Sequence, residues 1–135
     1  MEKYESKQQR ILRPASQIYS VISDFRNFTP VVQDKLEEWS ADETSCSFRM
    51  KGMTVRLCMV DKEPEQYVKI SGDDRSPLDF TMWVQLKQVE AYDTRMRLVL
   101  HIKLNFMMKM MIGSKLQDGL DQMAAQMAQA FNGGM

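Results

Sequence analysis

The sequence has few of the residues that build disulfide scaffolds, metal sites and catalytic centres. Its 135 residues include two cysteines and one histidine. Two cysteines are too few for a disulfide scaffold and the wrong number for a zinc site, so we expect reduced thiols and a cytoplasmic protein. The sequence has no glycine-rich phosphate loop, no metal-ligand cluster and no nucleophile beside a base. It therefore predicts no catalytic residue, no metal and no cofactor.

The chain also lacks net charge and long hydrophobic runs. Lysine plus arginine equals aspartate plus glutamate, 18 of each, so the overall charge provides no long-range attraction for nucleic acid or an anionic membrane. The longest apolar run, 106–112, is interrupted by Lys109 and falls short of the ~18–20 residues of a membrane span. No apolar run follows a basic stretch near the N-terminus, so we expect no secretory signal. These absences predict neither a nucleic-acid partner nor a membrane span.

A long amphipathic segment, 106–131, is the strongest pattern that the sequence does contain. Apolar residues recur there at spacings of three and four, the period of one helix face: Ile112, Leu116, Leu120, Met123, Met127 and Phe131. Asn105 stands in the N-cap position. Such a helix spans on the order of 35–40 Å and needs a broad apolar surface to lie on. We expect one domain over residues 1–131 and a flexible tail over residues 132–135.

The N-terminal part of the chain predicts an edge strand and two short helices. Residues 3–12 are compatible with a strand. Pro14 occupies a first helical position, and apolar residues follow at helical spacing as far as Phe25. Pro30 disfavours helical geometry in the residue before it, so a second helix must begin near Pro30 and be short.

Between residues 35 and 104, apolar residues alternate with polar ones, as in half-buried strands. A two-residue loop between two of these strands pairs Phe48 with Val55 and puts the apolar side chains on one face. In the same register Cys46 and Cys58 point to opposite faces, which predicts two free thiols.

The last two strands predict a second hairpin. A three-residue turn at 91–93 places Val84 opposite Leu100, again with the large apolar residues on one face and a polar opposite face. One pair is unfavourable, because Lys87 would lie opposite Arg97, and like charges across strands destabilise a sheet. The element order predicts an α+β domain in which a curved antiparallel sheet of about seven strands wraps around the long C-terminal helix.

Three segments carry a resemblance to a known superfamily. Residues 14–19 (Pro-Ala-Ser-Gln-Ile-Tyr) are similar to its strand-to-helix transition, and residues 23–28 (Ser-Asp-Phe-Arg-Asn-Phe) to its aspartate–aromatic motif. Gly119-Leu120, followed by a Met/Ala-rich helix end, is similar too. With this element order, the sequence resembles the START-like helix-grip superfamily (SRPBCC), which includes polyketide cyclases and lipid-transfer domains. The resemblance implies a cavity between the sheet and the long helix that holds an apolar ligand.

The candidate ligand-binding residues are the apolar ones expected around such a cavity: Phe28, Trp39, Phe48, Val55, Leu57, Phe80, Met82, Leu98, Leu100, Met107, Met111 and Met123. A lining of this kind holds a ligand but offers little acid–base chemistry. Glu37 is the candidate polar group. If Trp39 pairs with Phe48 on the inner face, Glu37 points inward too; if the strand slips by one residue, Glu38 faces inward instead.

His101 and the methionine-rich start of the C-terminal helix need separate interpretations. His101 is out of phase with its apolar neighbours, and we expect it on the outer face opposite Trp83. Met107, Met110 and Met111 either are buried on both sides of the helix or form a deformable cavity mouth or a self-association patch.

Three functions are compatible with these patterns. The first is binding of a small hydrophobic or lipid-like ligand without catalysis. The second is a cyclase- or dehydratase-type enzyme acting on an apolar, polyketide-like substrate, with Glu37 and Tyr19 as polar groups. The third is a protein-interaction domain whose cavity is filled by its own side chains. The expected partners are an apolar small molecule or lipid and, through the methionine-rich start of the C-terminal helix, a second copy of the chain.

Overall fold

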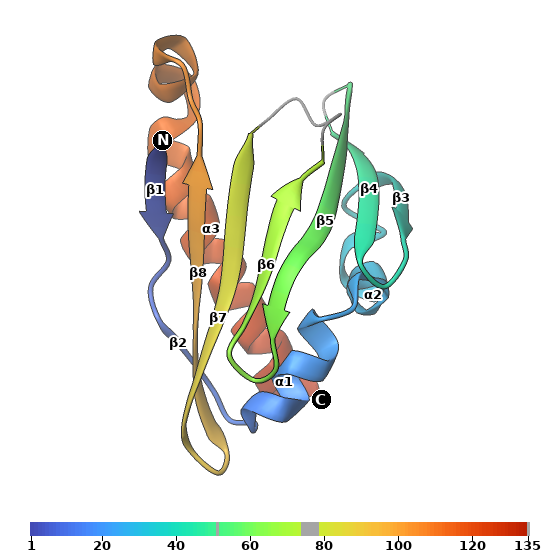
Figure 1. Ribbon diagram of the computed structural model, residues 1–135, viewed down its shortest axis with the longest axis vertical. Coiled ribbons are helices and arrows are strands. Elements are labelled where there is room, and N and C mark those ends of the chain that lie inside the picture. The colour runs from blue at the N-terminus through green and yellow to red at the C-terminus, as the bar shows by residue number, and fades with distance from the viewer. Residues whose placement is uncertain (51, 74–78, 135) are drawn as a thin grey trace.

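The computed structural model describes residues 1–50, 52–73 and 79–134 and consists of one antiparallel sheet with a long helix on its inner face (Figure 1). The strand order is β1-β8-β7-β6-β5-β4-β3, and β2 also pairs with β8. The strands are β1 (Glu2–Glu5), β2 (Gln9–Ile11), β3 (Glu37–Ala41), β4 (Ser45–Met50), β5 (Met53–Glu63), β6 (Tyr67–Gly72), β7 (Phe80–Glu90) and β8 (Asp93–Ile102). The helices are α1 (Ala15–Ile22), the 3-10 helix η1 (Phe25–Phe28), α2 (Thr29–Val32) and α3 (Phe106–Gly134). The expected α+β architecture is confirmed.

The expected first strand is split into β1 and β2, which both pair with β8. At the break, the N–H of Ser6 donates to the carbonyl of Leu98 (2.8 Å). The Ser6 hydroxyl accepts a hydrogen bond from the N–H of Leu98 (2.9 Å). A side chain therefore replaces a backbone acceptor where the strand is interrupted, so β8 keeps its hydrogen bonds at this edge.

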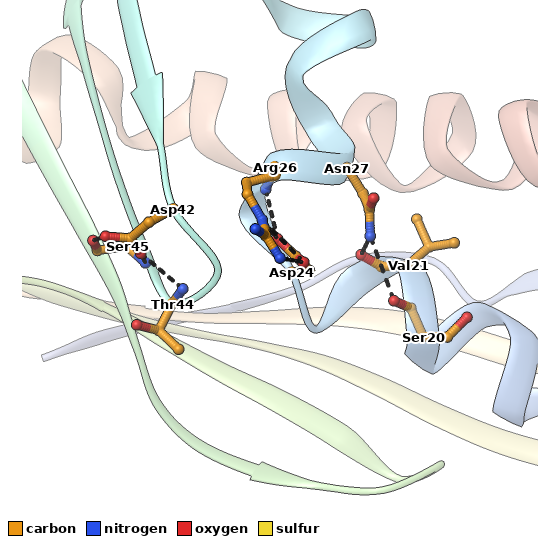
Figure 2. A network of polar contacts seen from close by, with 8 residues as sticks. All are labelled: Ser20, Val21, Asp24, Arg26, Asn27, Asp42, Thr44 and Ser45. Atoms are coloured by element: carbon orange, nitrogen blue, oxygen red, sulfur yellow. Dashed lines mark hydrogen bonds and ion pairs between the residues drawn. The ribbon is translucent and has the colours of Figure 1, made fainter.

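The aspartate–aromatic segment is held by its own polar side chains (Figure 2). The Asp24 carboxylate accepts hydrogen bonds from the backbone N–H of Arg26 (2.9 Å) and from its guanidinium (2.7 Å). The side-chain amide of Asn27 donates to the carbonyl of Val21 (3.1 Å) at the end of α1. These contacts cap η1 and fix the angle at which the chain leaves α1.

The register of the β4–β5 hairpin is confirmed. Phe48 lies opposite Val55, and Cys46 lies opposite Leu57. Cys58 pairs with Ser45, one residue out of phase with Cys46, and these two cysteines are not joined by a disulfide.

The predicted register of the β7–β8 hairpin is wrong by two residues. Val84 lies opposite Leu98 rather than Leu100, because Glu90 pairs with Asp93 and the ladder shifts between Gln88 and Glu90. A shift of two preserves the face of every side chain, so the apolar inner face is unchanged.

The new register also changes the partners on the outer face of this hairpin. The like-charged pair is Lys87 and Arg95, and His101 lies opposite Thr81 rather than Trp83. The outer-face placement of His101 nevertheless holds, because its ring makes an edge-to-face contact with the Trp83 ring (4.7 Å between centroids).

Helix α3 begins where the sequence predicts. The side-chain carbonyl of Asn105 accepts a hydrogen bond from the N–H of Met108 (2.8 Å), as an N-cap does. Further along, the buried residues of the helix are Leu120, Ala124, Ala128 and Phe131. The centre of the buried stripe is therefore formed by alanines, which the sequence pattern of large apolar residues did not include.

The end of α3 differs from the expected flexible tail. The helix continues to Gly134, because the side chain of Asn132 accepts a hydrogen bond from the N–H of Leu12 (2.7 Å) and donates one to the carbonyl of Arg10 (3.0 Å). Earlier in the helix, Asp121 accepts a hydrogen bond from the N–H of Lys7 (2.7 Å). These hydrogen bonds hold the polar side of α3 against the β1–β2 edge of the sheet. Of the helices in the described ranges, none has the length and hydrophobicity needed to cross a membrane.

Candidate functional site

The inner face of the sheet has a closed part and an open part. The closed part lies where α3 packs on β1, β2 and β8, and where α1 packs on β6 and β7. Ala124 and Ala128 of α3 are 0% and 4% exposed, and their small side chains let the helix approach the strands. Leu98 and Leu100, two of the candidate ligand-binding residues, are 0% and 9% exposed and belong to this closed core.

The open part, which we call the open apolar face, consists of half-buried inner-face residues on β4, β5 and the first residues of β7: Phe48, Val55, Leu57, Phe80 and Met82. In the β-ladders, Phe48 pairs with Val55, and Met82 lies between Ile70 and Leu100. The open apolar face therefore continues directly from the closed core without an intervening polar row.

Two aromatic residues border the open apolar face from β3 and η1. The ring of Trp39 stacks on that of Phe48, with centroids 6.3 Å apart and planes at 28°. The Trp39 indole N–H donates a hydrogen bond to the Thr29 hydroxyl (2.8 Å), so the polar atom of the indole is satisfied and its apolar surface remains available. Phe28, the residue before Thr29, is half-buried and packs against the core.

Met123 lies on the side of α3 that faces away from the edge strands. Gln117 donates from its side chain to the carbonyl of Glu5 (2.8 Å), which fixes one side of the helix toward β1. Met123 is about 120° around the helix axis from Gln117 and 45% exposed. This position points Met123 away from the β1–β2 edge of the sheet.

The methionines at the start of α3 occupy a different side of the helix. Met107, Met110 and Met111 are 70%, 71% and 67% exposed, so they are not buried on both sides. Met107 lies about 160° around the axis from Met123. The structure therefore places Met107 and its neighbour Met111 together, on a side of the helix different from that of Met123.

Glu37 is not a polar group of the inner face. It is exposed and pairs with Arg49, while Ser40 pairs with Ser47, so two residues of β3 lie opposite Phe48. This β-bulge includes Glu38, which has a positive φ of 54°. The bulge breaks the alternation, so Trp39 faces inward while Glu37 does not.

Two weakly acidic side chains near the inner face, Tyr19 and Cys46, stay protonated at neutral pH. Burial, followed by the charge of Glu63, raises the pKa of the Tyr19 phenol, which therefore stays protonated and can donate a hydrogen bond. Burial, with smaller contributions from Asp42 and Cys58, raises the pKa of the Cys46 thiol to about 12. Neither group is a general base near neutrality.

The described side chains bring together no group of three or more residues that would hold a metal ion. One polar region that the sequence did not suggest as a site is a hollow of about 560 Å³ on the outer face of the sheet, beside Trp83 and Arg97. The unfavourable charge pair involving Lys87 was its only sequence signal.

Comparisons with solved structures identify the fold. Norcoclaurine synthase from Thalictrum flavum, in complex with dopamine and hydroxybenzaldehyde, is similar with a TM-score of 0.75 and 10% identity, covering 95% of this chain and 84% of that chain. The Aha1 dimer from Colwellia psychrerythraea is similar with a TM-score of 0.73 and 14% identity, covering 99% and 98%. A structural-genomics protein from Mesorhizobium loti is similar with a TM-score of 0.72 and 10% identity, covering 99% of both chains.

No family model matches the sequence, and no curated protein matches it. At identities of 10–14%, the structural likeness concerns the fold and not the activity. The open antiparallel sheet, the long C-terminal helix and these similar structures together give the identification: the chain has the helix-grip fold of START-like (SRPBCC) proteins.

Proposed function

We propose that this protein binds a small hydrophobic or lipid-like molecule on the open apolar face, without catalysing a reaction. The observation that carries the proposal is that Phe48, Val55, Leu57, Phe80 and Met82 face the inside of the sheet yet remain half-buried. A contiguous apolar surface of this kind commonly marks a ligand-binding site. Trp39, Phe28 and Met123 border the site, and Leu98 and Leu100 underlie it.

The chemistry of the site favours binding over catalysis. The enzyme alternative required an inward-facing acid, and Glu37 lies outside the site. Tyr19 provides a hydrogen-bond donor, which suits orientation of a ligand better than proton abstraction. The structure of norcoclaurine synthase holds two small aromatic molecules, which is compatible with a ring-bearing ligand for this protein. Because that neighbour is an enzyme, the cyclase- or dehydratase-type function remains the alternative. The two cysteines, which are not joined by a disulfide, agree with a cytoplasmic location.

Two measurements test the proposal. Mass spectrometry of an organic extract of the purified protein should find a reproducible apolar molecule. An apolar fluorescent probe, 1-anilinonaphthalene-8-sulfonate, should bind with a change in Trp39 fluorescence, which is measured in a Trp83→Phe background. Absence of both signals would favour the third function, a protein-interaction domain with a filled interior.

A matched pair of variants in one strand locates the site. Val55 belongs to the open apolar face, whereas Val60 on the same strand is 53% exposed. Val55→Thr places a hydroxyl against the ligand with almost no change of shape, and we expect at least about fivefold weaker probe binding. Val60→Thr should leave binding unchanged. Equal binding by both variants would place the probe elsewhere.

A second role, self-association, rests on the apolar surface at the start of α3. We infer that Phe106, Met107, Met110 and Met111 form a contact with a second copy of this chain. These residues are 81%, 70%, 71% and 67% exposed and lie on two successive turns, so they form one patch. A self-complementary patch on a protruding helix suits a two-fold contact. The similar Aha1 structure, which is a dimer, agrees with this arrangement.

Size-exclusion chromatography with light scattering tests the self-association. Changing Met107 and Met111 together to Gln should convert a dimer to a monomer while leaving thermal stability within about 0.5 kcal/mol, because both side chains are exposed. Met123→Gln is the control and should leave the mass unchanged. A wild-type protein that stays monomeric at high concentration would contradict the self-association.

A further inference from the structure

The outer face of the sheet carries a hollow that is chemically unlike the open apolar face. In Figure 1, α3 passes behind β7 and β8, and the opposite face of these two strands carries none of the described helices. The hollow there has a volume of about 560 Å³, within the range of small-molecule sites. Its lining combines amides, aromatic rings and cations, among them Tyr67, Trp83, Gln85, Lys87, Arg95 and Arg97. None of these described lining residues is acidic.

Arg97 is held in place without losing its charge. Its guanidinium donates twice to the side-chain oxygen of Gln85, at 2.9 and 3.3 Å. Gln85 is neutral, so it orients the guanidinium but does not neutralise it. The nearby Glu5 is 3.4 Å away with a side chain 60% exposed, which makes it a weak, solvent-screened partner.

Arg95 is held by a carboxylate that it shares. Asp93 accepts from Arg95 (3.0 Å) and from Arg10 (3.1 Å), so one negative charge lies between two positive ones. The contact with Asp93 engages Nε and Nη2 of Arg95, and a guanidinium has five N–H donors in all. Arg95 therefore keeps donors for another acceptor.

Lys87 adds a third cation to the lining. It is exposed, takes part in none of the ion pairs formed by the described residues, and lies directly opposite Arg95 across the β7–β8 ladder. Like charges in such a pair destabilise the sheet, and a bound anion would remove the repulsion. Five cationic groups line the hollow or contact its lining, against three carboxylates: Arg10, Lys69, Lys87, Arg95 and Arg97 against Glu5, Asp61 and Asp93. The local excess is two positive charges.

The aromatic side of the hollow is also fixed in orientation. The Tyr67 hydroxyl donates to Asp61 (2.8 Å), which lies outside the hollow. The Trp83 ring lies between the Lys69 ammonium, 5.4 Å from its centroid, and the His101 ring. Two oriented aromatic side chains beside three cations suit a ligand that has both a planar ring and a negative group.

We propose that this hollow binds a small phosphate monoester that carries a planar ring, of the mononucleotide class. A phosphate monoester carries about −1.5 to −2 charges at neutral pH, which matches the local excess of two positive charges. A carboxylate supplies only one negative charge and leaves part of that excess uncompensated. The site is separate from the open apolar face, and neither proposal depends on the other.

Isothermal titration calorimetry at low ionic strength tests the site with adenosine monophosphate as the probe. Lys87→Gln should weaken binding about two- to fivefold, as expected for an exposed ion pair. Arg97→Gln should weaken it by about tenfold or more, because an oriented charged hydrogen bond is lost. The matched control is Lys3→Gln, which removes an exposed lysine from the adjacent strand β1, outside the hollow. It should leave the affinity unchanged.

Ligand fragments and salt distinguish the contribution of the ring to binding from that of the phosphate. Adenosine and inorganic phosphate should each bind more weakly than adenosine monophosphate, and benzoate more weakly than phenyl phosphate. Raising the salt concentration should weaken binding of the phosphate esters. Binding of adenosine monophosphate should change the fluorescence of Trp83 and should produce no change in Trp83→Phe.

Four results would overturn the proposal. The first is no binding of adenosine monophosphate at millimolar concentration. The second is an equal effect of Lys3→Gln and Lys87→Gln, which indicates diffuse attraction to the whole face. The third is equal affinity for adenosine and its monophosphate, and the fourth is equal affinity for benzoate and phenyl phosphate.

Discussion

The indole of Trp39 stacks on the ring of Phe48, with 6.3 Å between centroids, at the point where β3 bulges against β4. The same indole donates its N–H to the hydroxyl of Thr29, 2.8 Å away. Trp39 thus joins α2 to the sheet while its apolar surface borders the open apolar face. The hydrogen bond between Trp39 and Thr29 can be tested with a double-mutant cycle.

We expect Trp39→Phe and Thr29→Val to destabilise the protein by about 0.5–1.5 kcal/mol each, because each removes one partner of a hydrogen bond. The double variant should cost less than the sum of the two, since both changes break the same bond. Urea denaturation followed by circular dichroism measures the three values. Strictly additive losses would contradict a direct coupling of Trp39 and Thr29.

Stability should fall at alkaline pH because of Cys46. Its thiol has an ordinary pKa of 9.0, which burial raises to about 12 in the folded protein. Between these two values the unfolded chain releases the proton and the folded chain keeps it, so the free energy of unfolding decreases as pH rises. The expected loss is about 1 kcal/mol between pH 9 and 10.

Denaturation at several pH values measures this dependence. Cys46→Ala should flatten it between pH 9 and 10, whereas Cys58→Ala should retain it. A thiol titration of the denatured, unreduced protein should also find both cysteines reactive. An identical alkaline slope in wild type and Cys46→Ala would assign the effect to other groups.

The end of α3 should contribute measurably to stability. Asn132→Ala removes one hydrogen bond to Arg10 in β2 and one to Leu12 just after β2, and we expect a loss of about 1–2 kcal/mol. Gln129→Ala, an exposed position in the same turn region, should change stability by less than about 0.5 kcal/mol. If both substitutions cost the same, the C-terminal end of α3 is not fastened by Asn132.

Removing the positive charge of Lys87 should stabilise the protein while weakening anion binding. Lys87→Glu replaces a like-charged pair with an opposite-charged pair facing Arg95. We expect a gain of about 0.2–1 kcal/mol by thermal denaturation at low salt, declining as salt is added. A loss of stability would mean that Lys87 makes a favourable contact in the folded state.

Overall charge gave no sign of the outer hollow. The chain has 18 positive and 18 negative side chains, and this balance predicted no anionic partner. Pairing β6, β7 and β8 nevertheless brings Lys87, Arg95 and Arg97 into one lining without an acid. Net charge determines attraction at long range, whereas the position of each charge determines what binds at short range.

Local sequence determined those features in which neighbouring residues decide the geometry. A tight loop and one-sided alternation fixed Phe48 opposite Val55, and the N-cap preference of asparagine fixed the start of α3 at Asn105. The resemblance to helix-grip proteins followed from the same local motifs and the element order, and the structural comparisons confirm that fold.

Tertiary structure decided the features that the alternation of apolar and polar residues does not distinguish. A register shift of two residues keeps every side chain on its face, so periodicity alone could not distinguish Leu98 from Leu100 as the partner of Val84. A bulge with Glu38 at positive φ turned Glu37 outward, and alternation contains no signal for that bulge. The position of α3 across the strands determines which apolar residues are buried and which are half-buried. That position is set by contacts between residues more than a hundred positions apart, such as Lys7 and Asp121, and no local pattern encodes it.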